Sequence, residues 1–229
     1  MWYGTRRVEQ ILEQDRWNVE FFAGMAEIAL KSGYPLLEVG QIVKESRDSI
    51  DPQRHPDIEF NYIGLENVES HSGKLIGLQK KTGSEIKSRS KTFNEGNVLY
   101  GRLRPYLNKV YLCQKKPTHG ICSNEFIVLI PNKDIVSPKF LRYLLASEYV
   151  VRHVASYQSG AALPRIGVHD LFKLKVPVPS LKDQGEIESS LSIFEDRRDS
   201  LVQELDDLEK NIDEQLAKSL RLGKPQLFP

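Results

Sequence analysis

The sequence predicts an α+β fold, in which a mainly-β domain with inserted helices is followed by a long C-terminal coiled-coil helix. Short apolar or alternating runs recur between residues 36 and 179, separated by clusters of turn-forming residues, and this pattern is typical of strands. A charged, leucine-spaced segment follows from residue 182. The 229 residues suffice for one hydrophobic core and an extension.

The chain begins with a segment that predicts one or two helices. Apolar residues between Val8 and Leu30 follow helical spacing, with a break near residues 15–18. Gly33 and Pro35 end this segment, because glycine suits a helix terminus and proline drives the preceding residue towards extended geometry. We therefore expect four parts: a helical segment over 1–33, the mainly-β domain over 34–181, a coiled-coil spacer helix over 182–222 and a tail over 223–229.

Five strands and one helix are expected inside the mainly-β domain. Apolar residues at helical spacing follow Pro138, and Ser137 is a suitable N-cap, so a helix is predicted over 138–153. No internal repeat of fixed period occurs in the sequence. The predicted strands cover 60–65, 97–101, 109–113, 125–131 and 173–178.

The last element carries an apolar seam whose members are separated alternately by four and three residues, as in a coiled coil. Such a stripe needs a partner, which is either another helix or the N-terminal helix of the same chain. Arg198 interrupts the seam with a polar side chain of the kind that fixes coiled-coil register. The seam comprises Ile187, Leu191, Phe194, Arg198, Leu201, Leu205, Leu208 and Ile212.

No catalytic, cofactor or metal site emerges from the sequence. Phosphate-binding loops and methyltransferase signatures are absent, and the five histidines show no metal-ligand spacing. Glu85 and Lys87 have the local spelling of a nuclease motif but lie in a polar segment that should be an exposed loop. Cys113 and Cys122 are expected to be buried free thiols, which together with the lack of a signal peptide or spanning segment predicts a cytoplasmic chain.

Cations are distributed unevenly, although the net charge is only +1. Acidic residues outnumber basic ones by 12 to 6 between residues 182 and 222, so the mainly-β domain is basic. Its cations lie among short polar and apolar residues, a combination suited to phosphates and base edges, although solvated or tight loops remain the alternative. The candidate DNA-binding residues are Lys80, Lys81, Lys87, Arg89 and Lys91, then Arg102, Arg104, Asn108 and Lys109, and finally Gln158, Ser159 and Arg165.

Four short motifs, taken in order, resemble the specificity subunit of type I restriction-modification systems. They are GRLRPYL at 101–107, SNEF at 123–126, GAALPRI at 160–166 and VPVPSL at 176–181, the last leading to Gln184 and Ile187. The resemblance covers about residues 35–220. It implies one target-recognition domain and one helical spacer, which would form a non-catalytic DNA-binding subunit.

A full-length subunit of this kind has two recognition domains and two spacers, so the resemblance implies a half-subunit. Two copies would pair their C-terminal helices antiparallel and read a bipartite palindromic site. Adenine methylation and restriction would be performed by partner methyltransferase and restriction/translocase subunits, with S-adenosylmethionine on the methyltransferase. Origin from a larger fused restriction-methyltransferase is one alternative. Another is a coiled-coil assembly module whose β-rich head binds protein.

Overall fold

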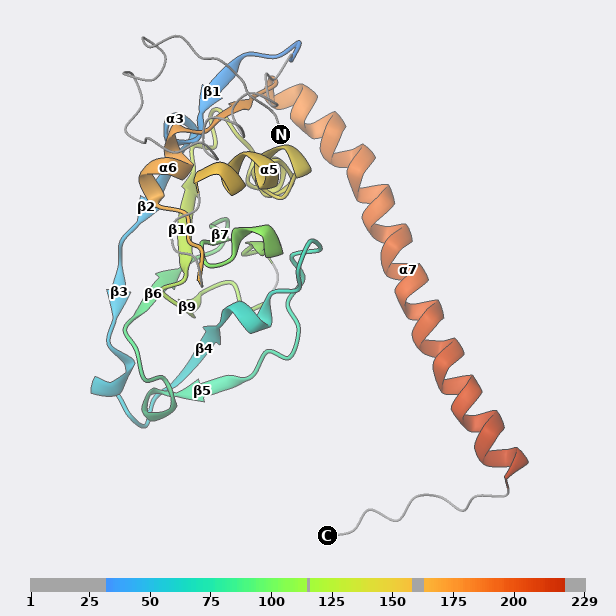
Figure 1. Cartoon of the computed structure of the whole chain (residues 1–229). Helices are drawn as coiled ribbons and strands as arrows, with labels where there is room; N and C mark the ends of the chain where they lie inside the picture. The colour runs from blue at the N-terminus through green and yellow to red at the C-terminus, as the bar shows by residue number, and fades with distance from the viewer. Residues whose placement is uncertain (1–31, 115, 158–162, 221–229) are drawn as a thin grey trace, which may run out of the picture. The chain divides into compact units, whose positions relative to one another are not determined.

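The structure is a computed structural model that describes residues 32–114, 116–157 and 163–220 (Figure 1). The helices expected over 8–30, the residues Gln158 and Ser159, and the predicted tail lie outside the described residues. Contacts divide the chain into two units, with the division after Gln184. The observed architecture is mixed helix and sheet with a long C-terminal helix, which confirms the predicted fold class.

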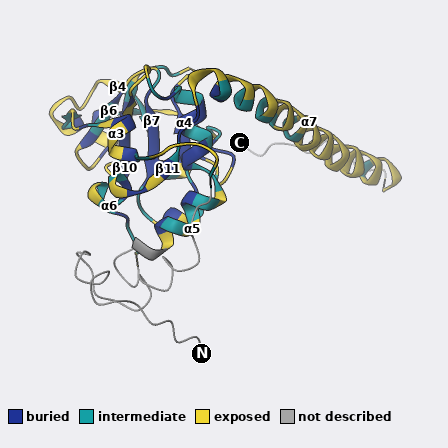
Figure 2. Ribbon diagram, turned by 90° about the horizontal axis from the view of Figure 1, so that it is seen from above, coloured by how far each residue is buried: buried dark blue, intermediate teal, exposed yellow. Residues whose placement is uncertain are grey.

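The first sheet of the globular unit has four antiparallel strands in the order β2-β10-β7-β8. Strand β10 is interior to this sheet, and four successive residues from Phe126 to Leu129 are fully buried, as expected of a strand covered on both faces. Figure 2 shows β7 and β10 coloured as buried. The bounds are β2 Val43–Ser46, β7 Val98–Gly101, β8 Val110–Leu112 and β10 Phe126–Pro131.

The second sheet has five strands in the order β3-β6-β9-β4-β5, and only the β4–β9 pair is parallel among its described pairs. Gly120 starts β9, where a Cβ atom would clash with the carbonyl oxygen of Asn61, so the close approach of the two backbones requires glycine. The bounds are β3 Ser49–Ile50, β4 Glu59–Ile63, β5 Lys80–Thr82, β6 Ser90–Phe93 and β9 Gly120–Cys122.

One core joins the two sheets. Side chains from the first sheet, including Leu99 and Val128, pack with Ile63, Phe93 and Cys122 of the second. Both cysteines are free and buried, as predicted, and burial raises the pKa of the Cys122 thiol to about 12. A third pair, β1 Leu36–Glu38 with β11 Lys175–Pro177, joins the first and last described strands of the globular unit.

Short helices surround the sheets. Helix α4 packs against β7 and β8, and α3 contacts α6. The α-helices are α3 Val39–Ile42, α4 Pro138–Leu145, α5 Glu148–Tyr157 and α6 Val168–Lys173; the 3₁₀ turns are η1 Pro52–Arg54, η2 Leu65–Asn67, η3 Gly83–Glu85 and η4 Pro105–Leu107.

The prediction of a single helix over 138–153 is wrong, because α4 and α5 are separate. Ser147 interrupts the helix: its hydroxyl donates to the carbonyl of Leu144 at 2.6 Å and accepts from the amide of Val150 at 3.4 Å. The carbonyl of Ala146 accepts a hydrogen bond from the side-chain amide of Asn108, Nδ2, at 2.7 Å. These side-chain hydrogen bonds replace backbone hydrogen bonds of a continuous helix. The helical spacing of the apolar residues does not reveal such a break.

The second unit is dominated by helix α7, Leu181–Ser219, which has 39 residues. It is coloured mostly as exposed in Figure 2, and Gln184 in its first turn is its buried residue. No helix in the described part of the chain is both long and apolar enough to span a membrane.

Candidate nucleic-acid interface

Two loops that were predicted as separate basic surfaces lie side by side. The amide of Arg104 donates to the carbonyl of Pro164 at 2.7 Å, and the amide of Ile166 donates to the carbonyl of Arg102 at 3.1 Å. Leu103 and Arg165 form the antiparallel bridge between them. The GRLRPYL motif and the described part of the GAALPRI motif, residues 163–166, therefore lie next to each other.

Glu125 connects this surface to the sheet, because it directly precedes β10. Its carboxylate receives a side-on pair of hydrogen bonds from Arg165, with the closest at 2.8 Å from Nη2 and another at 3.1 Å from Nε. Its carbonyl accepts from the amide of Arg102 at 2.8 Å. The Arg165 hydrogen bond, followed by the positive charges of Arg165, Arg102 and Lys91, lowers the pKa of Glu125. We call these four residues the Glu125 cluster.

Part of the first predicted group reaches the same region. Lys91 lies on β6, and its ammonium is 3.4 Å from the carboxylate of Glu45 on β2; both side chains are mostly buried. Arg89 donates from Nε to the hydroxyl of Ser49 at 2.9 Å, and its carbonyl accepts from the Asn124 amide at 2.5 Å. Asn124 and Glu125 come from the SNEF motif, so Arg89 and Lys91 are tied to it.

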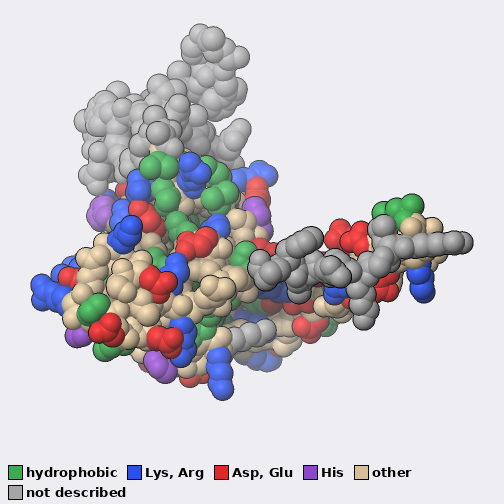
Figure 3. Space-filling view, turned by 90° about the horizontal axis from the view of Figure 1, so that it is seen from below, with side chains coloured by type: hydrophobic (Ala, Val, Ile, Leu, Met, Phe, Trp, Pro, Cys, Tyr) green, Lys and Arg blue, Asp and Glu red, His purple; other side chains and the backbone are tan. Residues whose placement is uncertain are grey.

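The remaining residues of that group lie elsewhere. Lys80 on β5 pairs with Glu59 at 3.1 Å, and Lys81 pairs with Glu66 at 3.7 Å while covering the Tyr62 ring at 4.8 Å. These acids are distant in the sequence, so local composition did not reveal them. Figure 3 shows Lys and Arg side chains interspersed with Asp and Glu on one face. The first group is thus divided among paired strand residues, the neighbourhood of the Glu125 cluster and the exposed Lys87.

The side chains of Asn108 and Lys109 donate hydrogen bonds to backbone carbonyls of the same chain. Asn108 is 7% exposed, has a positive φ of 48°, and holds the carbonyl of Ala146. The ammonium of Lys109 donates to the carbonyl of Leu65 at 2.7 Å. In this arrangement both side chains serve to shape the loop, and contact of either with DNA stays a prediction.

Arg104 and Lys87 are exposed cations, and Arg102 is partly exposed. Arg104 has φ 48° and ψ 60° and precedes η4, so its backbone is held in a left-handed conformation. The Nε atom of Arg102 is buried and has no hydrogen-bond partner within residues 32–114, 116–157 and 163–220. Arg104 and Lys87 therefore present exposed cations, whereas the Nε of Arg102 is shielded from solvent.

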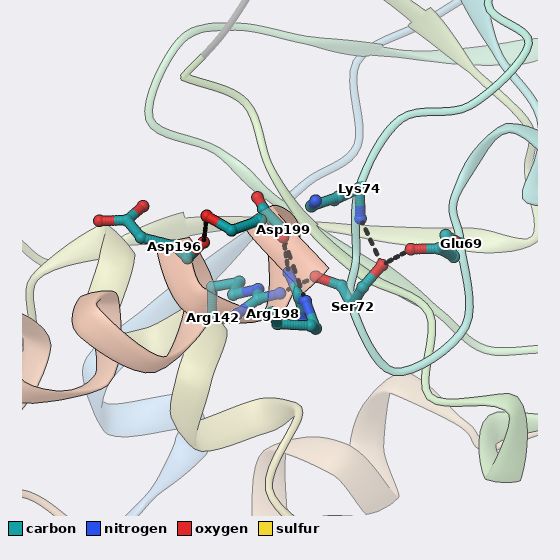
Figure 4. A network of polar contacts seen from close by, with 8 residues as sticks. Glu69, Ser72, Lys74, Arg142, Asp196, Arg198 and Asp199 are labelled. Carbon is teal, nitrogen blue, oxygen red and sulfur yellow. Dashed lines mark hydrogen bonds and ion pairs between the residues drawn. The ribbon is translucent and has the colours of Figure 1, made fainter. Parts of the chain in front are cut away.

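A further polar network holds the loop between Glu69 and Lys74, which the sequence did not single out (Figure 4). Arg142 of α4 donates to the carbonyl of Ser72, and the Ser72 hydroxyl donates to Glu69 and accepts from the amide of Lys74 at 3.2 Å. The network joins α4 to the turn that follows η2. Within the described residues, no group of three or more potential ligands could hold a metal ion.

The predicted seam lies on helix α7, where Phe194, Leu205 and Ile212 are 70%, 56% and 66% exposed. Ile187, Leu191 and Arg198 are partly exposed, and Leu201 and Leu208 are exposed. Arg198 makes an ion pair with its neighbour Asp199 at 3.1 Å. Helix α7 therefore carries apolar side chains that no described residue covers.

Comparison with known families decides what these features belong to. Residues 34–210 match the model of the type I restriction modification DNA specificity domain. The chain belongs to this family. The domain it defines confers DNA specificity and is not catalytic.

Other members of the family are similar over part of their length. The chain is 27% identical over 157 residues to the type I restriction enzyme EcoDI specificity subunit of Escherichia coli, covering 69% of this chain and 32% of that protein. It is 27% identical over 164 residues to the HindI specificity subunit of Haemophilus influenzae, covering 69% and 34%. The chain thus spans about a third of the length of these specificity subunits.

A solved specificity subunit has the same fold. The HsdS subunit from Thermoanaerobacter tengcongensis superposes with a TM-score of 0.67 at 22% identity, covering 88% of this chain and 53% of that one.

Glu125 is the functional candidate that sequence reasoning missed, although it lies inside the quoted SNEF motif. The signal was present there, but its partner Arg165 is 40 residues away.

Proposed function

We propose that this chain is the sequence-specific DNA-recognition component of a type I restriction-modification system. The observation that carries the proposal is that the loops bearing Arg102, Arg104 and Arg165 pair with each other in a DNA specificity domain. Arginine side chains on positioned loops suit both phosphate contacts and bidentate reading of guanine.

Two copies of the chain act together in this proposal, with helix α7 of each forming the dimer interface. The exposed seam supports this, because Leu201, Leu205 and Leu208 recur at coiled-coil spacing and are each about half exposed. Two identical recognition units related by a twofold axis would read a bipartite palindromic site. The separation of the two half-sites would then depend on the length of the paired helices.

Chemistry belongs to partner subunits in this proposal. A methyltransferase subunit carries S-adenosylmethionine and modifies adenines within the site, and a restriction/translocase subunit cleaves unmodified DNA. The chain supplies sequence recognition and assembly surfaces.

Co-expression with a cognate methyltransferase subunit in a methylation-free host tests the recognition role. Single-molecule sequencing should map modified adenines to a gapped palindrome, and the motif should vanish when this chain is omitted. Co-purification of the two proteins without any modified motif would contradict DNA recognition and favour an assembly module whose head binds protein.

The dimer is tested separately by light scattering of the purified chain. Replacing Leu205 and Leu208 by aspartate should convert the dimer to a monomer, because charges then lie in the seam. Replacing Gln203 and Asp207, which bond to each other at 3.0 Å on the same helix, by alanine is the matched control and should leave the dimer intact. A wild-type monomer at micromolar concentration would contradict the homodimer.

A further inference from the structure

A negatively charged side chain lies among the cations of the proposed DNA-binding surface. Glu125 faces Arg165, Arg102 and Lys91, and all three positive charges lower its pKa. A carboxylate at such a place repels phosphates, so by charge alone it weakens DNA binding. Its contacts indicate a different effect.

The donors of Arg165 are divided between the protein and the surface. A guanidinium has five N–H donors in one plane. Glu125 takes the Nε donor and one Nη2 donor, and the carbonyl of Leu163 accepts from Nη1 at 3.3 Å. One donor on each terminal nitrogen then remains, with no acceptor among the residues that the structure describes.

A planar pair of donors fits two acceptors of DNA. Two oxygens of a phosphate match it, and so does the O6 and N7 edge of guanine in the major groove. The Arg165 side chain is 37% exposed, which leaves its terminal nitrogens accessible.

Glu125 is itself held firmly. Its amide donates to the Ser123 hydroxyl at 3.2 Å, its carbonyl holds the amide of Arg102 at 2.8 Å, and the next residue, Phe126, is fully buried in β10. Arg165, like Glu125, lies outside the named helices and strands, and its backbone is anchored by the antiparallel bridge to Leu103. Both residues of the pair are therefore held by the backbone around them.

We propose that Glu125 is a positioning residue, which holds the Arg165 guanidinium so that its two remaining donors meet a phosphate or a guanine edge of DNA. This inference rests on the proposed DNA-recognition function. Arg102, whose backbone is bonded to both Glu125 and Ile166, adds a second cation beside the pair.

The positioning role and a simple charge effect predict opposite signs. Glu125→Gln removes a negative charge and would tighten DNA binding if charge alone mattered. Under the proposal it weakens binding about three- to tenfold, because the charge-assisted pair is lost. Arg165→Ala should weaken binding at least as much, and the double variant should be no weaker than Arg165→Ala alone.

The measurement is a fluorescence anisotropy titration of the full chain with a labelled 30-base-pair duplex pool of random sequence at low salt. Glu59→Gln is the matched control, since Glu59 pairs with Lys80 outside the Glu125 cluster, and it should bind as tightly as the wild type or slightly tighter. Thermal unfolding of each variant establishes that it is folded. If Glu125→Gln fails to fold, Arg165→Lys replaces it, because lysine keeps the charge but lacks the planar donor pair.

The outcomes separate the hypotheses. Three outcomes would each overturn the positioning role alone. The first is a folded Glu125→Gln variant that binds as tightly as the wild type, and the second is an additive effect of Glu125→Gln and Arg165→Ala. The third is an Arg165→Lys variant that binds like the wild type. A wild-type chain without salt-dependent DNA affinity would overturn the proposed function and this inference with it. For a phosphate contact, Arg165→Ala reduces the salt slope of log K by about 1; for a guanine contact it instead changes the bases selected from a randomised pool.

Discussion

Gln184 accepts a hydrogen bond from the backbone amide of Ser137 at 2.8 Å, and so joins the first turn of α7 to the N-terminus of α4. The Ser137 hydroxyl meanwhile caps α4 by accepting from the amide of Phe140 at 3.1 Å. The Gln184 amide also donates to the carbonyls of Ile135 and Pro179, each at 2.9 Å. The Gln184 side chain is fully buried, and all three of these hydrogen bonds join it to backbone atoms.

Gln184→Ala should destabilise the globular unit by about 2 kcal/mol, because it leaves buried backbone groups without partners. Urea unfolding followed by circular dichroism measures the change. Gln203→Ala is the control, because Gln203 is exposed on α7, and it should stay within about 0.5 kcal/mol of the wild type. Equal stability of the two variants would contradict a structural role for Gln184.

Arg102→Ala and Arg104→Ala should each weaken DNA binding, by about 1 to 3 kcal/mol where the side chain contacts a base. Both residues belong to the loop that pairs with residues 164–166. Anisotropy titrations with the duplex that carries the mapped motif measure the loss. Lys133→Ala, at an exposed lysine outside the candidate set, serves as the control and should bind normally. Unchanged affinity in both arginine variants would remove this loop from the interface.

Gly73 and Gly77 form a matched pair for testing backbone constraint, since both have positive φ angles, 65° and 54°. A Cβ atom at Gly73 would clash with the carbonyl oxygen of Val110, whereas one at Gly77 meets no described atom within 4 Å. Gly77→Ala should therefore cost about 1 to 2 kcal/mol from the left-handed conformation alone. Gly73→Ala should cost clearly more. Thermal melts compare them, and equal losses would contradict the predicted clash.

The stability contributed by Glu125 should depend on pH. Hydrogen bonding to Arg165 holds the pKa of Glu125 below its ordinary value of 4.5 in the folded state. Its contribution is therefore fully present above the unfolded pKa and is lost as the pH falls through the folded pKa. The difference in unfolding free energy between the wild type and Glu125→Gln should be constant near pH 7 and shrink in acid. A difference that grows below pH 4.5 would contradict the pairing.

The long elements of the fold could be predicted from the sequence, because periodicity is a local property. The heptad spacing indicated α7, and alternation near residues 97–131 indicated β7, β8 and β10. Strands such as β1, β5 and β9 were missed. Each has three residues and, unlike β8, which also has three, carries at most two apolar side chains. The break at Ser147 was missed because it depends on local polar bonds within an apolar pattern.

The sequence predicted which residues belong to the candidate site, but not which of them lie close together in space. Arg102, Arg104 and Arg165 were singled out as cations in separate loops, and their proximity follows from long-range pairing that no local pattern reveals. The acids Glu45, Glu59 and Glu66 pair with predicted DNA-binding lysines from distant segments. Counting charges along the chain therefore overstated how many cations are available to a ligand.

The pairing of β1 with β11 places Leu36 opposite Pro177, so the first and last described strands of the globular unit lie side by side. A unit with adjacent ends can be exchanged as a cassette, because its replacement need not change the distance that the flanking segments must span. New target sequences could then be acquired by swapping residues between these two strands for those of another family member. The helix that follows, α7, would be inherited unchanged.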